Sequence, residues 1–146
     1  MKISILLFSA ALLCAQSAKV DVISNAEMQR MEKKISGQKI GSESLARYSN
    51  SSMQLTRRET SGVVELHQNK ADIFYVRAGE ATLVEGGTVN HPKTTAPHEI
   101  RGESITGGSR HALGAGDLVH IPAGVPHQLL LAPGKTFTYI AFKIDQ

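Results

Sequence analysis

Residues 116–127 read Gly-Asp-Leu-Val-His-Ile-Pro-Ala-Gly-Val-Pro-His, and this stretch decides the fold. Leu118 to Ile121 form a short, mainly apolar run of strand length. Pro122 has a fixed φ and Gly124 tolerates a positive φ, so these two residues predict a tight turn after the strand. His127 then begins the next run. The stretch therefore predicts two consecutive β-strands joined by a tight turn.

The same stretch resembles the second sequence motif of the cupins, which is glycine, five residues, proline, one residue, glycine, two residues and histidine. Gly116, Pro122, Gly124 and His127 match all four positions. Leu131 stands where the motif usually adds an asparagine. The resemblance implies an all-β protein with a single cupin barrel (a double-stranded β-helix or jelly roll), preceded here by a short N-terminal helix.

Strand patterns continue on both sides of this stretch. Short apolar or alternating runs, broken by glycine and proline, predict strands near 53–58, 62–67, 72–77, 81–85, 110–113, 117–121, 127–131 and 136–144. Many short strands with little helix indicate a β-sandwich or barrel. Runs such as Ile73-Phe74-Tyr75-Val76 do not alternate, so we expect a second layer or a partner subunit outside the sheet. A homodimer is the expected assembly.

The N-terminus has the pattern of a secretory signal peptide. Lys2 is followed by an apolar run from Ile3 to Leu13, and small residues precede a cut before Ala18. The run is shorter than the roughly 20 residues that a membrane-spanning helix needs. A lipoprotein anchor at Cys14 and a buried N-terminal strand are the alternatives. We expect a signal peptide at residues 1–17 and a secreted or periplasmic protein without membrane attachment after its removal.

The remaining chain divides into a helical segment and a barrel. Ser24 and Glu27 form a capping box, and Met28, Met31 and Ile35 follow at helical spacing, which predicts a helix over about residues 25–35. We expect an N-terminal helical segment at residues 18–44. The cupin barrel is expected at residues 45–146.

Composition limits the classes of function. The chain has 146 residues, 41% of them hydrophobic, and a net charge of +3, which fits one soluble domain. There is no basic stripe with interleaved aromatic residues, so we expect no nucleic-acid partner. Cys14 is the only cysteine and would leave with the signal peptide. Any metal must therefore be held by histidine, aspartate, glutamate or water.

The first cupin motif is His-x-His, three or four residues, glutamate, six residues and glycine, and the chain matches it in part. With Gly79 as the glycine, Asp72 takes the glutamate position, His67 the second histidine position and Glu65 the first. A register with His67 and Asn69 as the pair leaves only two residues before Asp72 and breaks the spacing. The resemblance thus implies that Glu65, His67, Asp72 and His127 are the metal ligands.

Strand geometry supports this set from the residues alone. Residues i and i+2 of a strand project from the same face, so Glu65 and His67 point together, and Asp72 follows after a short turn. Two imidazoles and two carboxylates suit Mn, Fe, Zn or Ni and do not choose among them. Each residue also has a plain structural interpretation: Glu65 as a solvated acid, His67 as a polar strand residue and Asp72 as a turn cap.

Several other polar residues have no single predicted role. The stretch from Gly86 to Arg110 is long for a connection and is expected either to cover the barrel mouth as a lid or to be loose. Arg101 or Arg110 near the metal would favour an anionic ligand. Arg57-Arg58 is expected to place one side chain inside and one outside. The roles of His98, His111 and His120 stay open.

The reaction cannot be derived from the fold, so three functions remain. The first is a metal-dependent oxidoreductase of the dioxygenase type that acts on a small organic molecule. The second is a non-catalytic sensor or carrier that binds a metal or a small molecule. The third is a metal-free barrel in which Glu65 and His127 perform acid–base chemistry. A vacant metal position beside an acid or base, such as unbound Glu65, His120 or Tyr75, would indicate an enzyme.

Overall fold

A computed structural model describes residues 20–146 of the chain. The expected signal peptide at residues 1–17, with Cys14, lies outside these described residues. Within residues 20–146 the chain forms one helix and thirteen strands. None of the helical structure in this range is long and apolar enough to cross a membrane.

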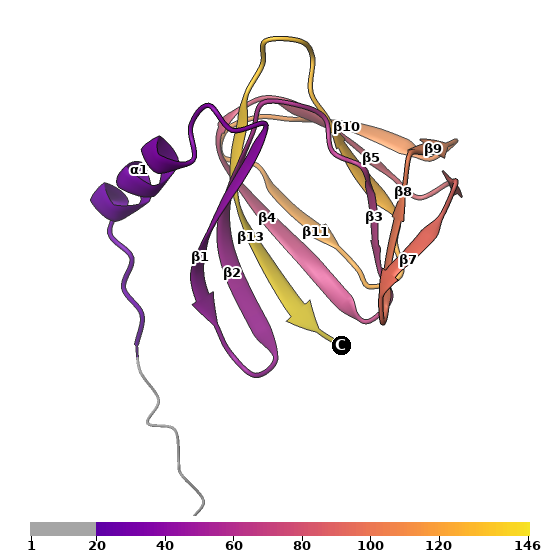
Figure 1. Ribbon diagram of the computed structural model, residues 1–146, viewed down its shortest axis with the longest axis horizontal. Helices are drawn as coiled ribbons and strands as arrows, with labels where there is room; N and C mark the ends of the chain where they lie inside the picture. Colours follow the sequence, from indigo (N-terminus) through magenta and orange to yellow (C-terminus); the bar gives the residue numbers. More distant parts are fainter. Residues whose placement is uncertain (1–19) are drawn as a thin grey trace, which may run out of the picture.

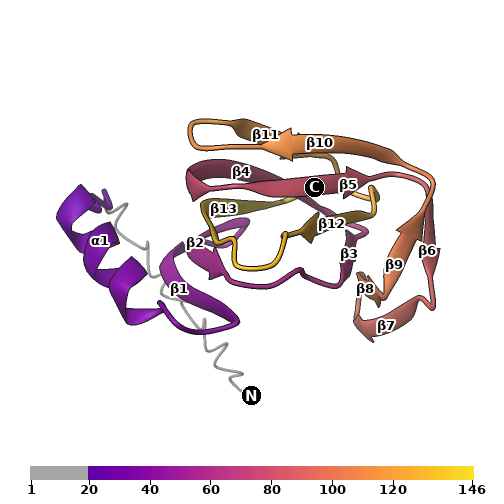
Figure 2. The ribbon, with the colours of Figure 1, turned by 90° about the horizontal axis from the view of Figure 1, so that it is seen from above.

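Two antiparallel sheets face each other and form a barrel, as the sequence predicts (Figure 1). The first sheet has the order β1-β2-β13-β4-β11, with bounds Ile40–Arg47, Ser51–Arg58, Phe137–Asp145, Lys70–Gly79 and Leu118–Ile121. The second has the order β10-β5-β12-β3-β8-β7, with bounds Ser109–Leu113, Ala81–Glu85, His127–Leu130, Val64–His67, Glu99–Gly102 and Lys93–Ala96. A separate ribbon of β6 (Thr88–Asn90) and β9 (Ser104–Thr106) lies at the opposite end from the helix (Figure 2).

The apolar core fills one part of the barrel interior. Its buried members come from both sheets and are Phe74, Val76, Ala81, Leu83, Leu113, Ile121, Leu129, Phe137, Tyr139 and Ala141. The rings of Phe74 and Tyr139 lie 4.9 Å apart between centroids, at a tilted angle that aromatic pairs favour. The ring of Phe74 also meets the ring of His127 edge-on at 6.2 Å. Phe74 therefore marks the boundary between the apolar core and a polar part of the interior.

The helix α1 (Asn25–Lys34) forms as the capping box predicts. The Ser24 hydroxyl accepts a hydrogen bond from the Glu27 backbone N–H at 3.2 Å, and the Glu27 carboxylate accepts one from the Ser24 N–H at 3.0 Å. The helix contacts β2, and its Glu32 carboxylate lies 2.6 Å from the Arg77 guanidinium on β4. Tyr75 and Leu118, opposite each other on β4 and β11, remain 43% and 71% exposed.

Two expectations from the sequence differ from the structure, one on a domain boundary and one on a long connection. Residue 45 falls inside β1, because Ile40–Arg47 pairs along β2 although its Gly- and Ser-rich sequence has weak strand propensity. The stretch from Gly86 to Arg110 is not loose, since it contains β6, β7, β8 and β9, and both β7 and β8 extend the second sheet. These strands are only three or four residues long and carry many polar residues, so no apolar alternation announces them.

Gly79, the glycine of the first motif, tests the register of β4 against β13. It ends β4 with a φ of +81°, and an added Cβ would overlap the Thr136 carbonyl oxygen. We expect Gly79→Ala to lower the free energy of unfolding by more than about 2 kcal/mol. Gly134 also has a positive φ (+75°) but has open space around it, so Gly134→Ala should cost only about 1 kcal/mol. Urea unfolding measures both, and equal losses would contradict the close approach at Gly79.

Candidate metal centre

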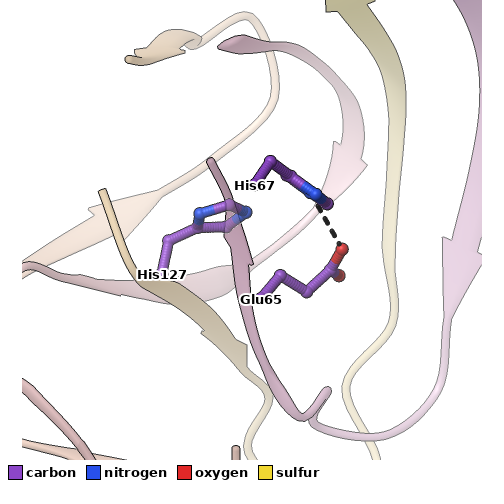
Figure 3. Close-up of side chains that lie close together, drawn as sticks. All are labelled: Glu65, His67 and His127. Carbon is purple, nitrogen blue, oxygen red and sulfur yellow. Dashed lines mark ion pairs between the residues drawn. The ribbon is translucent and has the colours of Figure 1, made fainter. Parts of the chain in front are cut away.

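The four predicted ligands come from three strands whose inner faces meet in the barrel. Glu65 and His67 are alternate residues of β3, Asp72 lies on β4 and His127 begins β12. The register places His127 directly opposite Glu65. Figure 3 shows that the side chains of Glu65, His67 and His127 gather at one point, where a dashed line joins Glu65 and His67. The expected i, i+2 geometry on β3 is therefore present.

Short distances bring all four side chains together. Glu65, His67 and His127 each place one ligand atom within 4.8 Å of the others, a grouping that can hold a metal ion. Asp72 Oδ2 lies 3.4 Å from His67 Nε2 and 3.4 Å from His127 Nε2. His67, Asp72 and His127 are all at most 3% exposed. That these residues bind a metal stays a prediction.

Hydrogen bonds fix the orientation of both imidazole rings. Nδ1 of His67 donates to Glu99 Oε2 at 2.6 Å, and Nδ1 of His127 donates to the Val125 carbonyl at 3.1 Å. Both rings therefore direct Nε2 at the site. The outer nitrogen of a metal-binding histidine is commonly held in this way by a carboxylate or a backbone carbonyl. Nε2 of His127 is buried and has no hydrogen-bond partner among the described residues.

A lysine that sequence reasoning overlooked contacts two members of the cluster. Nζ of Lys143 is 2.8 Å from both carboxylate oxygens of Asp72 and 2.8 Å from His67 Nε2. Lys143 lies on β13 directly opposite Asp72. The sequence pattern does indicate that Lys143 faces inward. Tyr139, Ala141 and Lys143 are alternate residues of one strand and so face the same side, and Tyr139 and Ala141 are core residues.

Glu65 is paired with further cations. Arg58 is 7% exposed and donates hydrogen bonds to Tyr139 Oη at 3.0 Å and to Glu65 Oε1 at 3.2 Å. Arg101 on β8 lies 3.8 Å from Glu65 and 3.0 Å from Glu99. The prediction that one residue of Arg57-Arg58 points inward and the other outward is confirmed. Arg58 is the buried one, whereas Arg57 pairs with Glu59. Arg101 lies at the site, whereas Arg110 is exposed on β10.

The charges of the cluster shift the pKa values of its members. Burial raises the pKa of Glu65, but its hydrogen bond to His67 and the charge of Lys143 outweigh burial and lower the pKa to about 2. The same competition, with the imidazoles of His127 and His67 beside the carboxylate, brings the pKa of Asp72 well below its usual range. Both carboxylates are therefore ionised at neutral pH.

His67 and Lys143 together carry positive charge against these carboxylates. Burial lowers the pKa of His67, but hydrogen bonds to Asp72 and Glu65 raise it to about 9. Nζ of Lys143 lies 2.8 Å from Nε2 of His67, and the charge of Lys143 opposes this rise in the pKa of His67.

The turn of the second motif supports β3. Gly116 and Gly124 adopt φ values of +93° and +79°, as expected for the positions that favour glycine. The Gly124 N–H donates to the His67 carbonyl at 2.7 Å. The motif therefore positions two predicted ligands at once, because its turn binds the backbone of His67 and its last residue is His127.

The remaining histidines lie elsewhere. His111 on β10 and His120 on β11 are exposed and line a separate groove of about 710 Å³, which none of the four predicted ligands lines. His98 is exposed in the turn before β8, with a φ of 64°. Tyr75 lies on an exposed position of β4. Of the three residues named as a possible acid or base beside the metal, only Glu65 therefore lies in the cluster.

Two cavities border the site. An inner cavity of about 60 Å³ is lined by Arg58, Glu65, Asp72 and Lys143 among others. An outer pocket of about 390 Å³ has a polar lining that includes Arg47, Ser51, Glu99 and Asp145. Lys143 and Gln54 line both. The two cavities therefore adjoin at Gln54 and Lys143.

The lowered carboxylate pKa values predict how stability depends on pH. A carboxyl group whose pKa is lower in the folded state stabilises the protein above its ordinary pKa, and this contribution disappears as pH falls through the folded value. We expect the free energy of unfolding of the metal-free protein to decrease between pH 4.5 and about pH 2. Glu65→Gln should flatten this decrease by about 2 kcal/mol. Urea unfolding in a chelator across this pH range measures it.

The matched control is Glu80→Gln, because the Glu80 side chain is 70% exposed and pairs with Lys135 on the surface. This substitution should leave the pH dependence as in the unaltered protein. A Glu65→Gln curve parallel to that of the unaltered protein would contradict the ionised, buried Glu65.

Comparison with known proteins adds evidence on the fold. The sequence matches no protein-family model and no curated protein. The TT1209 structure from Thermus thermophilus is similar with a TM-score of 0.62 and 12% identity, over 86% of this chain and 98% of that chain. A predicted oxalate decarboxylase from Thermotoga maritima has a TM-score of 0.55 and 13% identity, over 73% of this chain and 81% of that one.

A Cupin 2 conserved barrel domain protein from Salinispora arenicola is similar with a TM-score of 0.50 and 20% identity, over 73% of this chain and 76% of that chain. Identities this low establish the fold and no activity. The two-sheet barrel, the second motif and these structural neighbours all indicate the same fold. The chain therefore has the cupin fold, and it is similar in structure to proteins of the cupin superfamily.

Proposed function

We propose that this protein binds a divalent metal ion inside the barrel through Glu65, His67, Asp72 and His127. The observation that carries the proposal is the buried, unpartnered Nε2 of His127, which lies beside a carboxylate and a second imidazole. A buried polar atom without a partner is costly, and a metal ion would satisfy it. The donor set of nitrogen and oxygen suits Mn, Fe, Zn or Ni.

We propose further that the metal serves a reaction on a small organic molecule, of the oxidoreductase, dioxygenase-like type. When bound, the metal would supply a Lewis acid and a template for substrate. Two histidines with a carboxylate match the composition of non-haem iron oxygenase sites. The outer pocket admits a small polar molecule, and Arg58 and Arg101 hold Glu65 in place. The neighbour described as a predicted oxalate decarboxylase supports small-molecule chemistry on such a barrel.

The second candidate is binding without turnover, as a sensor or carrier. The observation that favours it is the inner cavity of only about 60 Å³ next to Glu65 and Asp72, which leaves little room for a substrate beside four protein ligands. Sites closed by four protein ligands are typically structural, whereas catalytic sites keep an open position. Substrate turnover by the metal-loaded protein separates the two candidates.

We also propose that the protein acts outside the cytoplasm. The signal pattern at residues 1–17 supports export, and exposed Tyr75 and Leu118 support a homodimer. When the full chain is expressed with its own N-terminus, we expect to find the protein in the periplasm. Its intact mass should match a mature chain that begins at Ala18. A periplasmic species that begins at Met1, or a lipid-modified Cys14, would contradict this prediction.

Metal content tests the main proposal directly. We expect mass spectrometry of the purified mature protein to find a near-stoichiometric Mn, Fe, Zn or Ni, and to find it lost from both His67→Ala and His127→Ala. Each substitution removes one inward-facing imidazole nitrogen. Losing one ligand or one of its supporting partners typically weakens metal affinity at least about 10- to 100-fold.

His111→Ala is the matched control, because His111 is an exposed histidine on β10 and lines the separate groove. It should retain the metal of the unaltered protein. An unaltered protein that stays empty after reconstitution with each of the four ions would refute the proposal and favour a metal-free barrel.

A further inference from the structure

Lys143 contacts two of the four predicted metal ligands. Its Nζ contacts Asp72 Oδ1, Asp72 Oδ2 and His67 Nε2, each at 2.8 Å. The ammonium group donates hydrogen bonds to both carboxylate oxygens of Asp72 and lies against Nε2 of His67, and these are atoms that a metal ion would bind. A metal held by Asp72 and His67 therefore competes with Lys143 for the same atoms.

Lys143 also stands between two spaces. It lines the inner cavity with Glu65 and Asp72, and it lines the outer pocket with Glu99 and Asp145. Its side chain is 24% exposed, whereas that of Asp72 is 1% exposed. Asp145 is two residues further along β13 and so lies on the same face. An ammonium group that leaves Asp72 therefore finds carboxylates in the outer pocket.

We propose that Lys143 is a built-in cation that holds the metal position in the metal-free protein and moves toward the outer pocket when a metal binds, so that Lys143 sets the metal affinity. This inference rests on the proposed function of the same four ligands. The physical reason is charge. Asp72 is buried and needs a cation, and an ammonium group and a divalent ion repel each other strongly at contact distance in a poorly hydrated site.

Metal titration of variants tests the inference. Lys143→Met shortens the side chain by only one atom and removes its charge, and we expect it to bind Zn²⁺ or Mn²⁺ at least tenfold more tightly than the unaltered protein. Lys143→Arg keeps the charge and should bind no more tightly than the unaltered protein. Lys135→Met is the matched control on an exposed lysine and should leave the affinity unchanged. Circular dichroism confirms that each variant is folded.

The outcomes separate this inference from the proposed function. Equal affinity of the unaltered protein and Lys143→Met would overturn the role of Lys143 and leave metal binding intact. Binding only by Lys143→Met would support the role of Lys143 as the occupant. Binding by none of the proteins would overturn both.

A second measurement uses the unaltered protein, in case Lys143→Met does not fold. Reductive methylation labels lysine amines according to their access to reagent, and mass spectrometry reports each site. We expect saturating Zn²⁺ to increase labelling of Lys143 several-fold and to leave exposed Lys135 unchanged. Labelling of Lys143 that stays constant or falls when the metal binds would overturn the proposed movement.

Discussion

The carboxylate of Asp72 is 1% exposed, and the arrangement around it follows from the need to pair that buried charge. An isolated carboxylate in a barrel interior is too costly to remain ionised, so it either takes up a proton or acquires partners. Asp72 accepts hydrogen bonds from Lys143 at 2.8 Å, and the imidazole rings of His67 and His127 place Nε2 3.4 Å from its carboxylate. Each of them comes from a different strand, β13, β3 or β12. The charge of one side chain thus links strands of both sheets.

Sheet register delivers these partners. Asp72 lies opposite Lys143 in the first sheet, and Glu65 lies opposite His127 in the second. A shift of one residue in either pairing would turn these side chains out of the barrel and bury their neighbours instead. The aromatic core next to the site, where Phe74 packs on both Tyr139 and His127, resists such a shift because its rings occupy the same inner face. Core packing and site geometry therefore depend on one register.

Sequence predicts the barrel and most of its site for identifiable reasons. The turn at Pro122 and Gly124 is local, and so is the i, i+2 relation of Glu65 and His67, so both can be read from spacing. The polar strands β6 to β9 lack an apolar pattern and form because pairing with neighbours overrides propensity. Glu99 contacts His67 from one of these strands, and Lys143 contacts Asp72 although the two residues are 71 positions apart in the sequence. Such contacts are set by the fold as a whole.

Charge connects the two departures from the first cupin motif with Lys143. Asp72 stands where the motif has glutamate, and the ammonium group of Lys143 contacts both of its carboxylate oxygens. Glu65 stands where the motif has histidine and adds a negative charge, which Arg58 and Arg101 face. The polar part of the interior therefore holds two ionised carboxylates, and cations from β13, β2 and β8 balance their charge.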